Sequence, residues 1–197
     1  MKILFIRHGQ TQLNAEGRWL GSTDAPLSEA GKEVIISKKN IIDKYKPVQK
    51  LYVSPMKRCL ETAGIYFSDM KEENKEIIND LKERCFGDFE GKNHDELKND
   101  PHYKEFFRSN WQSNVPNGEE ADSFFGRTEK AYLYIIEDMK KNNLDYTAVV
   151  THGGVIMSIF SRYEKQKLEF YDYLLQNGSG YYAEIDDKNY ISIIEKL

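Results

Sequence analysis

Short, nearly continuous apolar runs alternate along this chain with longer segments whose apolar residues recur at helical spacing. The clearest runs are Lys2–Ile6, Leu51–Val53 and Tyr146–Val150. Such runs are typical of parallel strands covered on both faces, because a strand with one solvated face would alternate apolar and polar residues. Strands that alternate with helices form an α/β fold. We therefore expect a three-layer sandwich with a mainly parallel central sheet, helices on both of its faces, and a helical lid insertion.

The segments between the apolar runs carry recognisable helix signals. Ser28 is a good N-cap for a first helix, which should end before Pro47. Pro55 is expected at the first position of a second helix, which continues through Leu60. Later helices are expected within Asp95–Trp111, over Ala121–Met139, and through Ile156 and Phe160. Further strands are expected at Ile77 and Ile78 and as a terminal hairpin of Tyr181–Ile185 with Ile191–Ile194.

The length of 197 residues suits one compact domain and is short for two. The chain has no internal repeat, low-complexity tract or linker, so we expect a single domain over residues 1–197. Within it, residues 92–118 place aromatic side chains at helical spacing inside a charged sequence. That combination predicts one or two short helices laid over the core as a lid.

Composition argues against several classes of function. The formal net charge is −4, so no global basic field would draw the chain to nucleic acid or to an anionic membrane. The two cysteines cannot build a disulfide framework, and their scarcity fits a reducing cytosol. The apolar start, Met1–Ile6, is too short for a signal peptide or a membrane span. We expect a cytoplasmic protein with no nucleic-acid or membrane partner, and the sequence leaves its oligomeric state open.

Polar side chains of an unusual kind follow three of the expected strands. Arg7 and His8 directly follow the first strand, and Arg58 comes shortly after the second. His152 directly follows the late strand. Ligands of open parallel sheets bind beyond the carboxyl ends of the strands, so these side chains would converge if the strands are neighbours. Because arginine presents a planar fork of donors and histidine titrates near pH 6.5, we expect a small positive pocket for phosphate or carboxylate.

Three segments together resemble the motifs of the histidine phosphatase superfamily, the phosphoglycerate mutase-like group. They are Arg7-His8-Gly9-Gln10-Thr11 with Asn14, Ser54-Pro55-Met56-Lys57-Arg58 with Thr62, and Thr151-His152-Gly153-Gly154. Their order and placement match the family from Lys2 to about Ile156, which is most of the chain. The combination is far more specific than any one segment.

The resemblance implies covalent phosphoryl transfer, in which a ring nitrogen of His8 is phosphorylated during turnover. It also implies that the phosphoryl group or its loop is held by the following residues: Arg7, Arg58, His152, Thr11, Asn14 and Gly153. A fixed cluster of cations can position the group and stabilise its charge. We therefore expect no metal ion and no other cofactor.

A general acid must still protonate the leaving group, and the resemblance implies Glu83 for this role. The segment Leu81-Lys82-Glu83, ahead of Cys85–Gly91, is similar to the family segment that supplies a glutamate. Glu83 would protonate the ester oxygen and then, as a carboxylate, activate the water that attacks phosphohistidine. This requires a pKa above the ordinary value of about 4.3, which partial burial would provide. Without the resemblance, Glu83 would be a solvated loop carboxylate.

The choice within the superfamily depends on the middle of the chain. Phe86–Gly91 and the turn Asn117–Glu120 resemble the hydrolase branch more than the mutases. Between Lys92 and Gly118, four basic residues are balanced by four acidic ones, which is a poor trap for a second phosphate. The first hypothesis is a phosphomonoesterase acting on a small phosphorylated metabolite, resembling the α-ribazole phosphatases or a broad-specificity relative. The alternatives are a cofactor-dependent phosphoglycerate mutase and a non-catalytic module that binds phosphorylated ligands.

Other conspicuous residues receive no catalytic role. His94 and His102 match no compact metal-binding spacing and are expected to be incidental to a polar surface. Cys85 is treated as a small hydrophobe. Core or lid packing, with the option of walling a substrate pocket, is expected for the large aromatic residues Trp19, Tyr103, Phe106, Phe107 and Trp111.

Overall fold

A single six-stranded sheet forms the centre of the computed structural model, which describes residues 1–197. The strands are β1 (Lys2–Arg7), β2 (Lys50–Val53), β3 (Lys75–Ile77), β4 (Tyr146–Thr151), β5 (Gly180–Ile185) and β6 (Ile191–Lys196). Their order across the sheet is β3-β2-β4-β1-β5-β6. The four strands from β3 to β1 are parallel, whereas β5 runs antiparallel to β1 and pairs with β6 as a hairpin. The expected mainly parallel sheet and terminal hairpin are confirmed.

The order of the strands brings the predicted site segments together. Strand β4 lies between β1 and β2, so it is hydrogen-bonded to both. Arg7 at the end of β1 is in register with Thr151 at the end of β4, and Val53 at the end of β2 is in register with Val150. The three segments that follow these strands therefore leave the sheet at the same edge.

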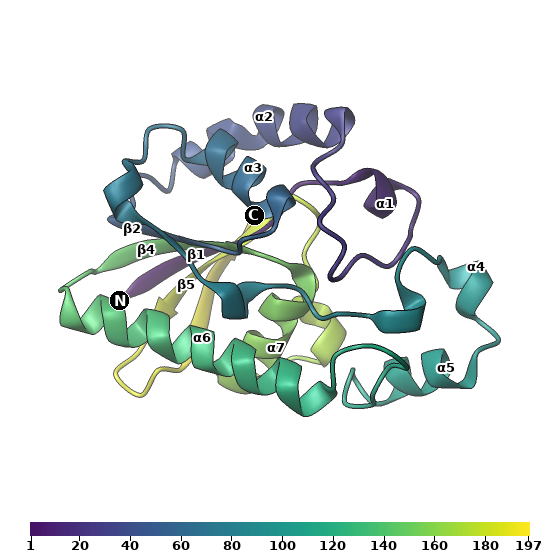
Figure 1. Ribbon diagram of the computed structural model, residues 1–197. Helices are drawn as coiled ribbons and strands as arrows, with labels where there is room; N and C mark the ends of the chain where they lie inside the picture. Colours follow the sequence, from purple (N-terminus) through teal and green to yellow (C-terminus); the bar gives the residue numbers. More distant parts are fainter.

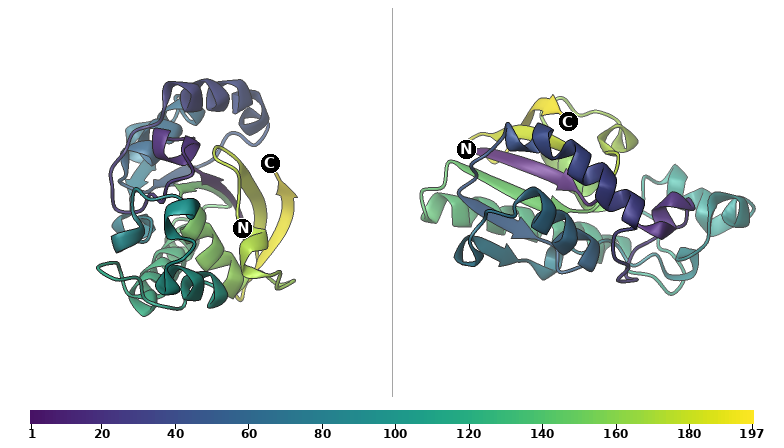
Figure 2. Two further views of the ribbon diagram at one scale, coloured as in Figure 1. Left: turned by 90° about the vertical axis from the view of Figure 1, so that its right-hand side faces the viewer. Right: turned by 90° about the horizontal axis from the view of Figure 1, so that it is seen from above.

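Helices cover both faces of the sheet and give the molecule three layers. On one face lie α2 (Glu29–Asp43) and α3 (Lys57–Tyr66), and on the other lie α6 (Ala121–Lys141) and α7 (Gly153–Tyr163). Figure 1 shows the sheet between the two pairs of helices, and the turned views of Figure 2 show the same layering. Alternate residues of β1 point to opposite faces, with Ile3 and Phe5 in one apolar cluster and Leu4 and Ile6 in the other.

Local capping explains where the helices of one face begin and end. Ser28 caps α2 by accepting a hydrogen bond from the Gly31 amide (3.0 Å), and the helix ends at Asp43, ahead of Pro47. The expected start of α3 at Pro55 is wrong, because the helix begins at Lys57. Ser54 still continues the sheet through its amide bond to the Val150 carbonyl (3.0 Å), so the chain completes a turn before it becomes helical.

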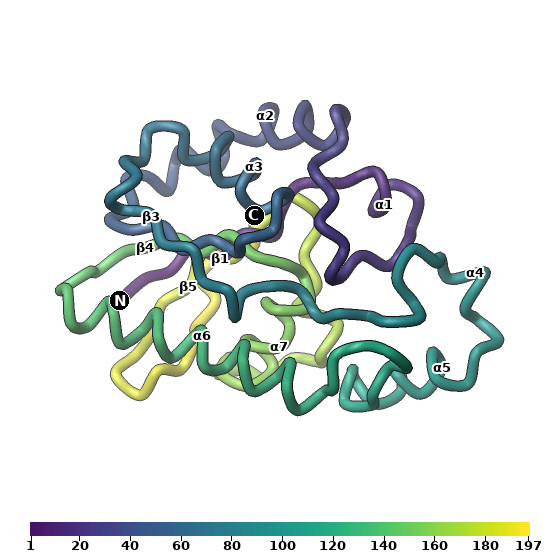
Figure 3. The backbone as a smooth tube through the Cα atoms, viewed as in Figure 1, coloured from purple at the N-terminus to yellow at the C-terminus, as the bar shows by residue number.

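The segment 92–118 carries two short helices, as expected. They are α4 (His94–Leu97) and α5 (Pro101–Arg108), and with the short α1 (Gln12–Ala15) they lie beyond the carboxyl ends of the strands, at the right of Figure 1 and of the tube in Figure 3. Trp19 joins this segment to the core, since its ring packs edge-on against Tyr103 and Phe106 of α5. Single 3₁₀ turns complete the structure at η1 (Glu72–Asn74), η2 (Asn79–Leu81), η3 (Gly87–Phe89) and η4 (Phe170–Tyr173). None of the helices is long and apolar enough to cross a membrane.

Candidate active site

Two histidines and two arginines meet where β1, β4 and β2 end. Arg7 is the last residue of β1 and His8 follows it, while His152 follows β4 and Arg58 lies in the first turn of α3. The rings of His8 and His152 are 5.2 Å apart between centroids. Arg58 and His152 are completely buried, and His8 is 4% exposed. The structure therefore brings together the four residues that the strand ends predicted to converge.

The hydrogen bond of His8 fixes which of its ring nitrogens can react. Nδ1 lies 2.7 Å from the carbonyl oxygen of Gly9, and because a carbonyl can only accept, Nδ1 must carry the proton. Burial, followed by the charges of Arg58 and Arg7, lowers the pKa of His8 well below 6.5. The ring is therefore neutral near pH 7, and Nε2 carries a free lone pair.

His152 is held in the opposite tautomer. Arg58 donates from Nε to His152 Nδ1 (3.2 Å), so His152 Nε2 carries the proton and donates to the Ser54 hydroxyl (2.8 Å). Burial and the charge of Arg58 lower the pKa of His152 well below 6.5. Both of its ring nitrogens are thus engaged, and its direct contact with phosphate stays a prediction.

The two arginines differ in how fully they are paired. Arg58 uses its remaining nitrogens on the carbonyls of Gly21 and Thr23, each at 2.9 Å. Arg7 donates from one terminal nitrogen to the Leu175 carbonyl (2.5 Å), but its buried Nε has no hydrogen-bond partner. A buried N–H without a partner is costly, so Arg7 presents a donor suited to an anion.

Glu83 reaches the same pocket from the loop between η2 and η3. Its carboxylate accepts hydrogen bonds from the amides of Gly154 and Arg84, both at 3.0 Å. Desolvation raises the pKa of Glu83, and this outweighs the lowering by those two amides and by Arg58 and Arg7. A Cβ at position 154 would lie 2.4 Å from a carboxylate oxygen of Glu83, so only glycine fits beside the acid.

Thr11 and Asn14 order the loop that follows His8. Thr11 is the N-cap of α1, where its hydroxyl accepts from the Asn14 amide (3.2 Å) and the Asn14 side chain accepts from the Thr11 amide (3.3 Å). Thr11 is buried and occupied by this cap, whereas Asn14 also lines the pocket. The Gly9 amide donates to the Thr62 hydroxyl (2.9 Å), which ties the loop to α3.

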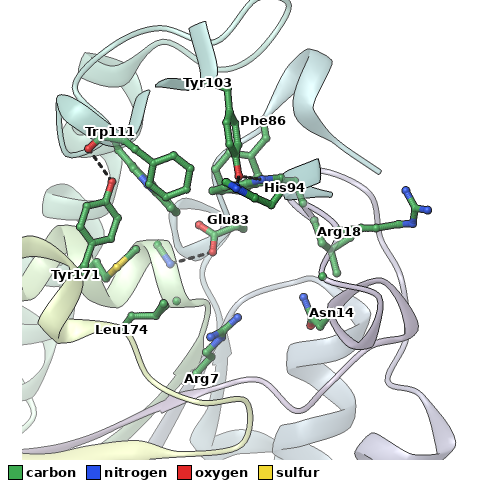
Figure 4. A pocket seen from close by; sticks show the side chains of 17 residues that line it. Arg7, Asn14, Arg18, Glu83, Phe86, His94, Tyr103, Trp111, Tyr171 and Leu174 are labelled. Carbon is green, nitrogen blue, oxygen red and sulfur yellow. Dashed lines mark hydrogen bonds between the residues drawn. The ribbon is translucent and has the colours of Figure 1, made fainter. Parts of the chain in front are cut away.

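A cavity of about 310 Å³ opens above Arg7 and Glu83. Figure 4 shows Arg7, Asn14 and Glu83 at its base and a ring of aromatic side chains over them. Its apolar wall is contributed by Trp19, Leu20, Phe86, Tyr103, Phe107, Trp111, Met157, Tyr171 and Leu174. Four of the five aromatic residues that were expected to pack in the core or lid, or to wall a substrate pocket, therefore line this cavity; Phe106 does not.

Several residues of the site were missed at the level of sequence. His94 was expected to be incidental, but it lines the cavity with Nδ1 3.3 Å from the Tyr103 hydroxyl. Asn177 donates to the His8 carbonyl (3.1 Å), and the Gly178 amide donates to the carbonyls of Arg7 and His8. The Asn-Gly dipeptide at 177–178 was a turn signal, but its contact with His8 spans 169 residues and left no local pattern.

The remaining histidine and the two cysteines provide neither a metal site nor a reactive buried thiol. No group of three or more His, Cys, Asp and Glu side chains could hold a metal ion. His102 is exposed on α5. Both cysteines are free, and burial raises the pKa of Cys59, beside His152, to about 12, so this thiol stays protonated.

A mostly parallel sheet with paired histidines and arginines at its carboxyl edge defines a phosphoryl-transfer enzyme of the phosphoglycerate mutase-like fold. A model of the histidine phosphatase superfamily (branch 1) matches residues 3–192, and the chain belongs to this family. It is a phosphatase of the histidine phosphatase type.

Named relatives and solved structures agree with this assignment. The chain is 32% identical over 164 residues to phosphoglycerate mutase-like protein 4 of Arabidopsis thaliana, covering 82% of this chain and 70% of that protein. It is 29% identical to the adenosylcobalamin/α-ribazole phosphatase of Escherichia coli, covering 82% and 78%. The α-ribazole phosphatase of Shigella flexneri superposes with a TM-score of 0.82 at 24% identity, covering 100% and 96%, and supports the fold alone.

Proposed function

We propose that this chain hydrolyses phosphate monoesters of small metabolites through a phosphohistidine intermediate on His8. The neutral ring of His8 carries this proposal, because the Gly9 carbonyl holds the proton on Nδ1 and leaves the Nε2 lone pair beside two arginines. Phosphoryl transfer depends mainly on positioning and on stabilising charge at the phosphate oxygens. Arg7 and Arg58 supply both, and His152 holds Arg58 in place.

The proposed reaction has two displacements that use the same carboxyl group. In the first, His8 Nε2 attacks phosphorus, the ester P–O bond breaks, and Glu83 gives its proton to the departing oxygen. In the second, water attacks phosphorus, Glu83 takes a proton from it, the P–N bond breaks, and inorganic phosphate leaves. The raised pKa of Glu83 suits this cycle, since the carboxyl is protonated more readily than an exposed glutamate.

The His8→Ala variant tests the covalent step. It should abolish hydrolysis of p-nitrophenyl phosphate and the 80 Da phosphoryl adduct, about the mass of one added HPO₃ group, that intact mass spectrometry at alkaline pH should detect on the wild-type chain. Hydrolysis by the variant at the wild-type rate would overturn the mechanism. Tight phosphate binding with no turnover by the wild type would instead support the non-catalytic binding module.

We also propose that the reaction needs no metal ion, because Arg7 and Arg58 already place fixed positive charge at the carboxyl edge of the sheet. Treatment with EDTA followed by gel filtration should therefore leave the turnover of p-nitrophenyl phosphate unchanged. A loss of activity that returns on adding a divalent cation would contradict this. Metal content of the untreated protein, measured by mass spectrometry, is the control.

The cavity favours an ester whose leaving group has a flat apolar surface, as the α-ribazole phosphatases would take. Its aromatic wall offers stacking surfaces, while Arg18, the arginine other than Arg7 that lines it, is already paired with Glu16 and Glu96. Relative kcat/KM should be highest for α-ribazole phosphate in a panel with phosphoserine and 3-phosphoglycerate. Isomerisation of 3-phosphoglycerate in the presence of its bisphosphate activator would favour the mutase alternative.

A further inference from the structure

Two arginines that do not belong to the phosphate pocket hold the segment that carries Glu83. Arg84 directly follows Glu83, and Arg127 lies on α6. Both direct their guanidinium groups to main-chain carbonyls on either side of the acid rather than to the cavity. The two guanidinium groups therefore fix the main chain of the loop around Glu83.

Arg84 connects the acid to the segment 92–118. It is completely buried and forms none of the ion pairs of the structure. Its guanidinium donates to the carbonyls of Trp111 (2.5 Å), Ser113 (3.0 Å) and Glu119 (3.0 and 3.1 Å). A buried charge is tolerated only when its N–H donors have hydrogen-bond partners. Moving one of these carbonyls away from Arg84 would leave a buried donor without a partner and would destabilise the fold. The positions of residues 84 and 111–119 are therefore fixed relative to each other.

Arg127 holds the other side of the loop. Nη1 donates to the carbonyls of Asp80 (2.9 Å) and Lys82 (2.6 Å), and Nη2 donates to the carbonyl of Glu83 itself (3.1 Å). Glu119 pairs with the same guanidinium through both carboxylate oxygens, at 2.7 and 2.8 Å. A planar fork that makes all of these bonds leaves the main chain at Glu83 little freedom.

The segment held by Arg84 also forms part of the wall of the cavity that Glu83 lines. Trp111 has a left-handed backbone conformation (φ 66°), and its ring lines the cavity. A Cβ at Gly154 would lie 2.4 Å from the Trp111 ring and 2.4 Å from Glu83 Oε1, so Gly154 lies against both groups at once. Arg84 directly follows Glu83 and donates to the Trp111 carbonyl. This hydrogen bond therefore connects the backbone of Glu83 to the Trp111 wall of the cavity.

We infer that Arg84 and Arg127 are positioning residues for the general acid, and that they link Glu83 to the Trp111 wall of the cavity. The inference rests on the proposed role of Glu83 in proton transfer. A leaving group seated against Trp111 would then lie at a fixed distance from the proton that it receives. Neither arginine would touch the phosphoryl group, so both would act only on the proton transfers that Glu83 carries out.

The Arg127→Gln variant tests this inference, because Arg127 is partly exposed and its loss is better tolerated than that of Arg84. Single-turnover release of p-nitrophenolate, a good leaving group, should stay near the wild-type rate. Turnover of an alkyl phosphate should fall at least about tenfold, since general acid catalysis is worth roughly 10²–10⁴-fold and a displaced acid loses part of it. Arg127→Lys should recover part of the loss on the alkyl ester.

A matched control and a second variant separate the possible outcomes. Arg162→Gln removes an arginine that pairs with Glu129 (2.6 Å) outside the site and should change neither rate. Equal slowing of both esters by Arg127→Gln would overturn the inference and indicate general damage to the fold. If that variant does not fold, Glu119→Gln, which removes only the partner carboxylate, should show the same selectivity. Absence of phosphoenzyme in the wild type would reject the proposed function and, with it, this inference, whereas equal slowing in a chain that forms phosphoenzyme would reject the inference alone.

Discussion

Two buried histidines stand side by side in this site with their protons on different nitrogens. The Gly9 carbonyl selects Nδ1–H in His8, whereas the Arg58 Nε–H selects Nε2–H in His152. One ring therefore presents a lone pair, and the other presents a donor to Ser54. Two chemically identical side chains acquire different roles from a single hydrogen bond each, which supports His8 as the nucleophile.

Replacement of Glu83 by glutamine removes the proposed acid and keeps its shape. We expect turnover of alkyl phosphates to fall by about 10²–10⁴-fold and single-turnover release of p-nitrophenolate to fall much less, because only the alkoxide needs a proton. Steady-state rates and single-turnover rates on the two esters provide the measurement. Glu105→Gln, at an exposed ion pair on α5, is the control. A uniform loss on both esters would argue against proton donation by Glu83.

The loop that follows η4 holds the backbone of His8 from the C-terminal part of the chain. Asn177 and Gly178 both donate to the carbonyl of His8, and the Leu175 carbonyl accepts from Arg7. Gly178 has φ 73°, and a Cβ there would lie 2.7 Å from a methyl group of Ile35. An element with no catalytic side chain of its own thus fixes the backbone of the first motif.

Alanine at position 178 should therefore reduce both stability and activity. The left-handed backbone costs a non-glycine residue about 1–3 kcal/mol, and the clash with Ile35 would displace the bonds to His8. Urea unfolding should show the lost free energy, with a lower kcat for p-nitrophenyl phosphate. Gly64→Ala, on the exposed side of α3 with no atom near its Cβ, should instead stabilise the chain by up to about 1 kcal/mol. Equal effects of the two substitutions would contradict this account of the loop.

The elements that the sequence predicted are those with a local signal. Apolar runs indicate β1, β2 and β4, and because these parallel strands end at one edge of the sheet, the residues that follow them, Arg58 and His152 among them, were predicted to converge. The start of α3 was misplaced, because Ser54 is held in the sheet by a partner almost 100 positions away in sequence. Arg84 and Arg127 went unnoticed for a similar reason, since they bind backbone carbonyls distant in sequence, which leave no side-chain pattern.

At the scale of the whole molecule, the site concentrates positive charge in a chain whose formal net charge is −4. That charge is carried by Arg7 and Arg58, since burial and their proximity keep both histidines neutral. The carboxylates paired with lysine at the surface, such as Asp43 and Asp138, have pKa values lowered from 3.8. Their contribution to stability is lost only at strongly acidic pH. The pH dependence of stability just below neutrality is therefore determined mainly by the two histidines.

Stability should consequently fall as the pH drops below 6.5. In the unfolded chain His8 and His152 take up protons near pH 6.5, but in the folded chain their pKa values are well below it. Because unfolding then binds protons, the free energy of unfolding falls with each pH unit by up to about 1.4 kcal/mol per histidine, until the pH reaches the pKa of the folded state. Glu83 has the opposite effect, because its raised pKa makes stability fall as the pH rises above 4.5. It is a single group, however, and two histidines contribute to the loss of stability at lower pH. The decrease in melting temperature from pH 7.5 to 5.5 should be smaller in His8→Asn than in the wild type, and an identical decrease would show that the folded chain does not keep the His8 ring neutral.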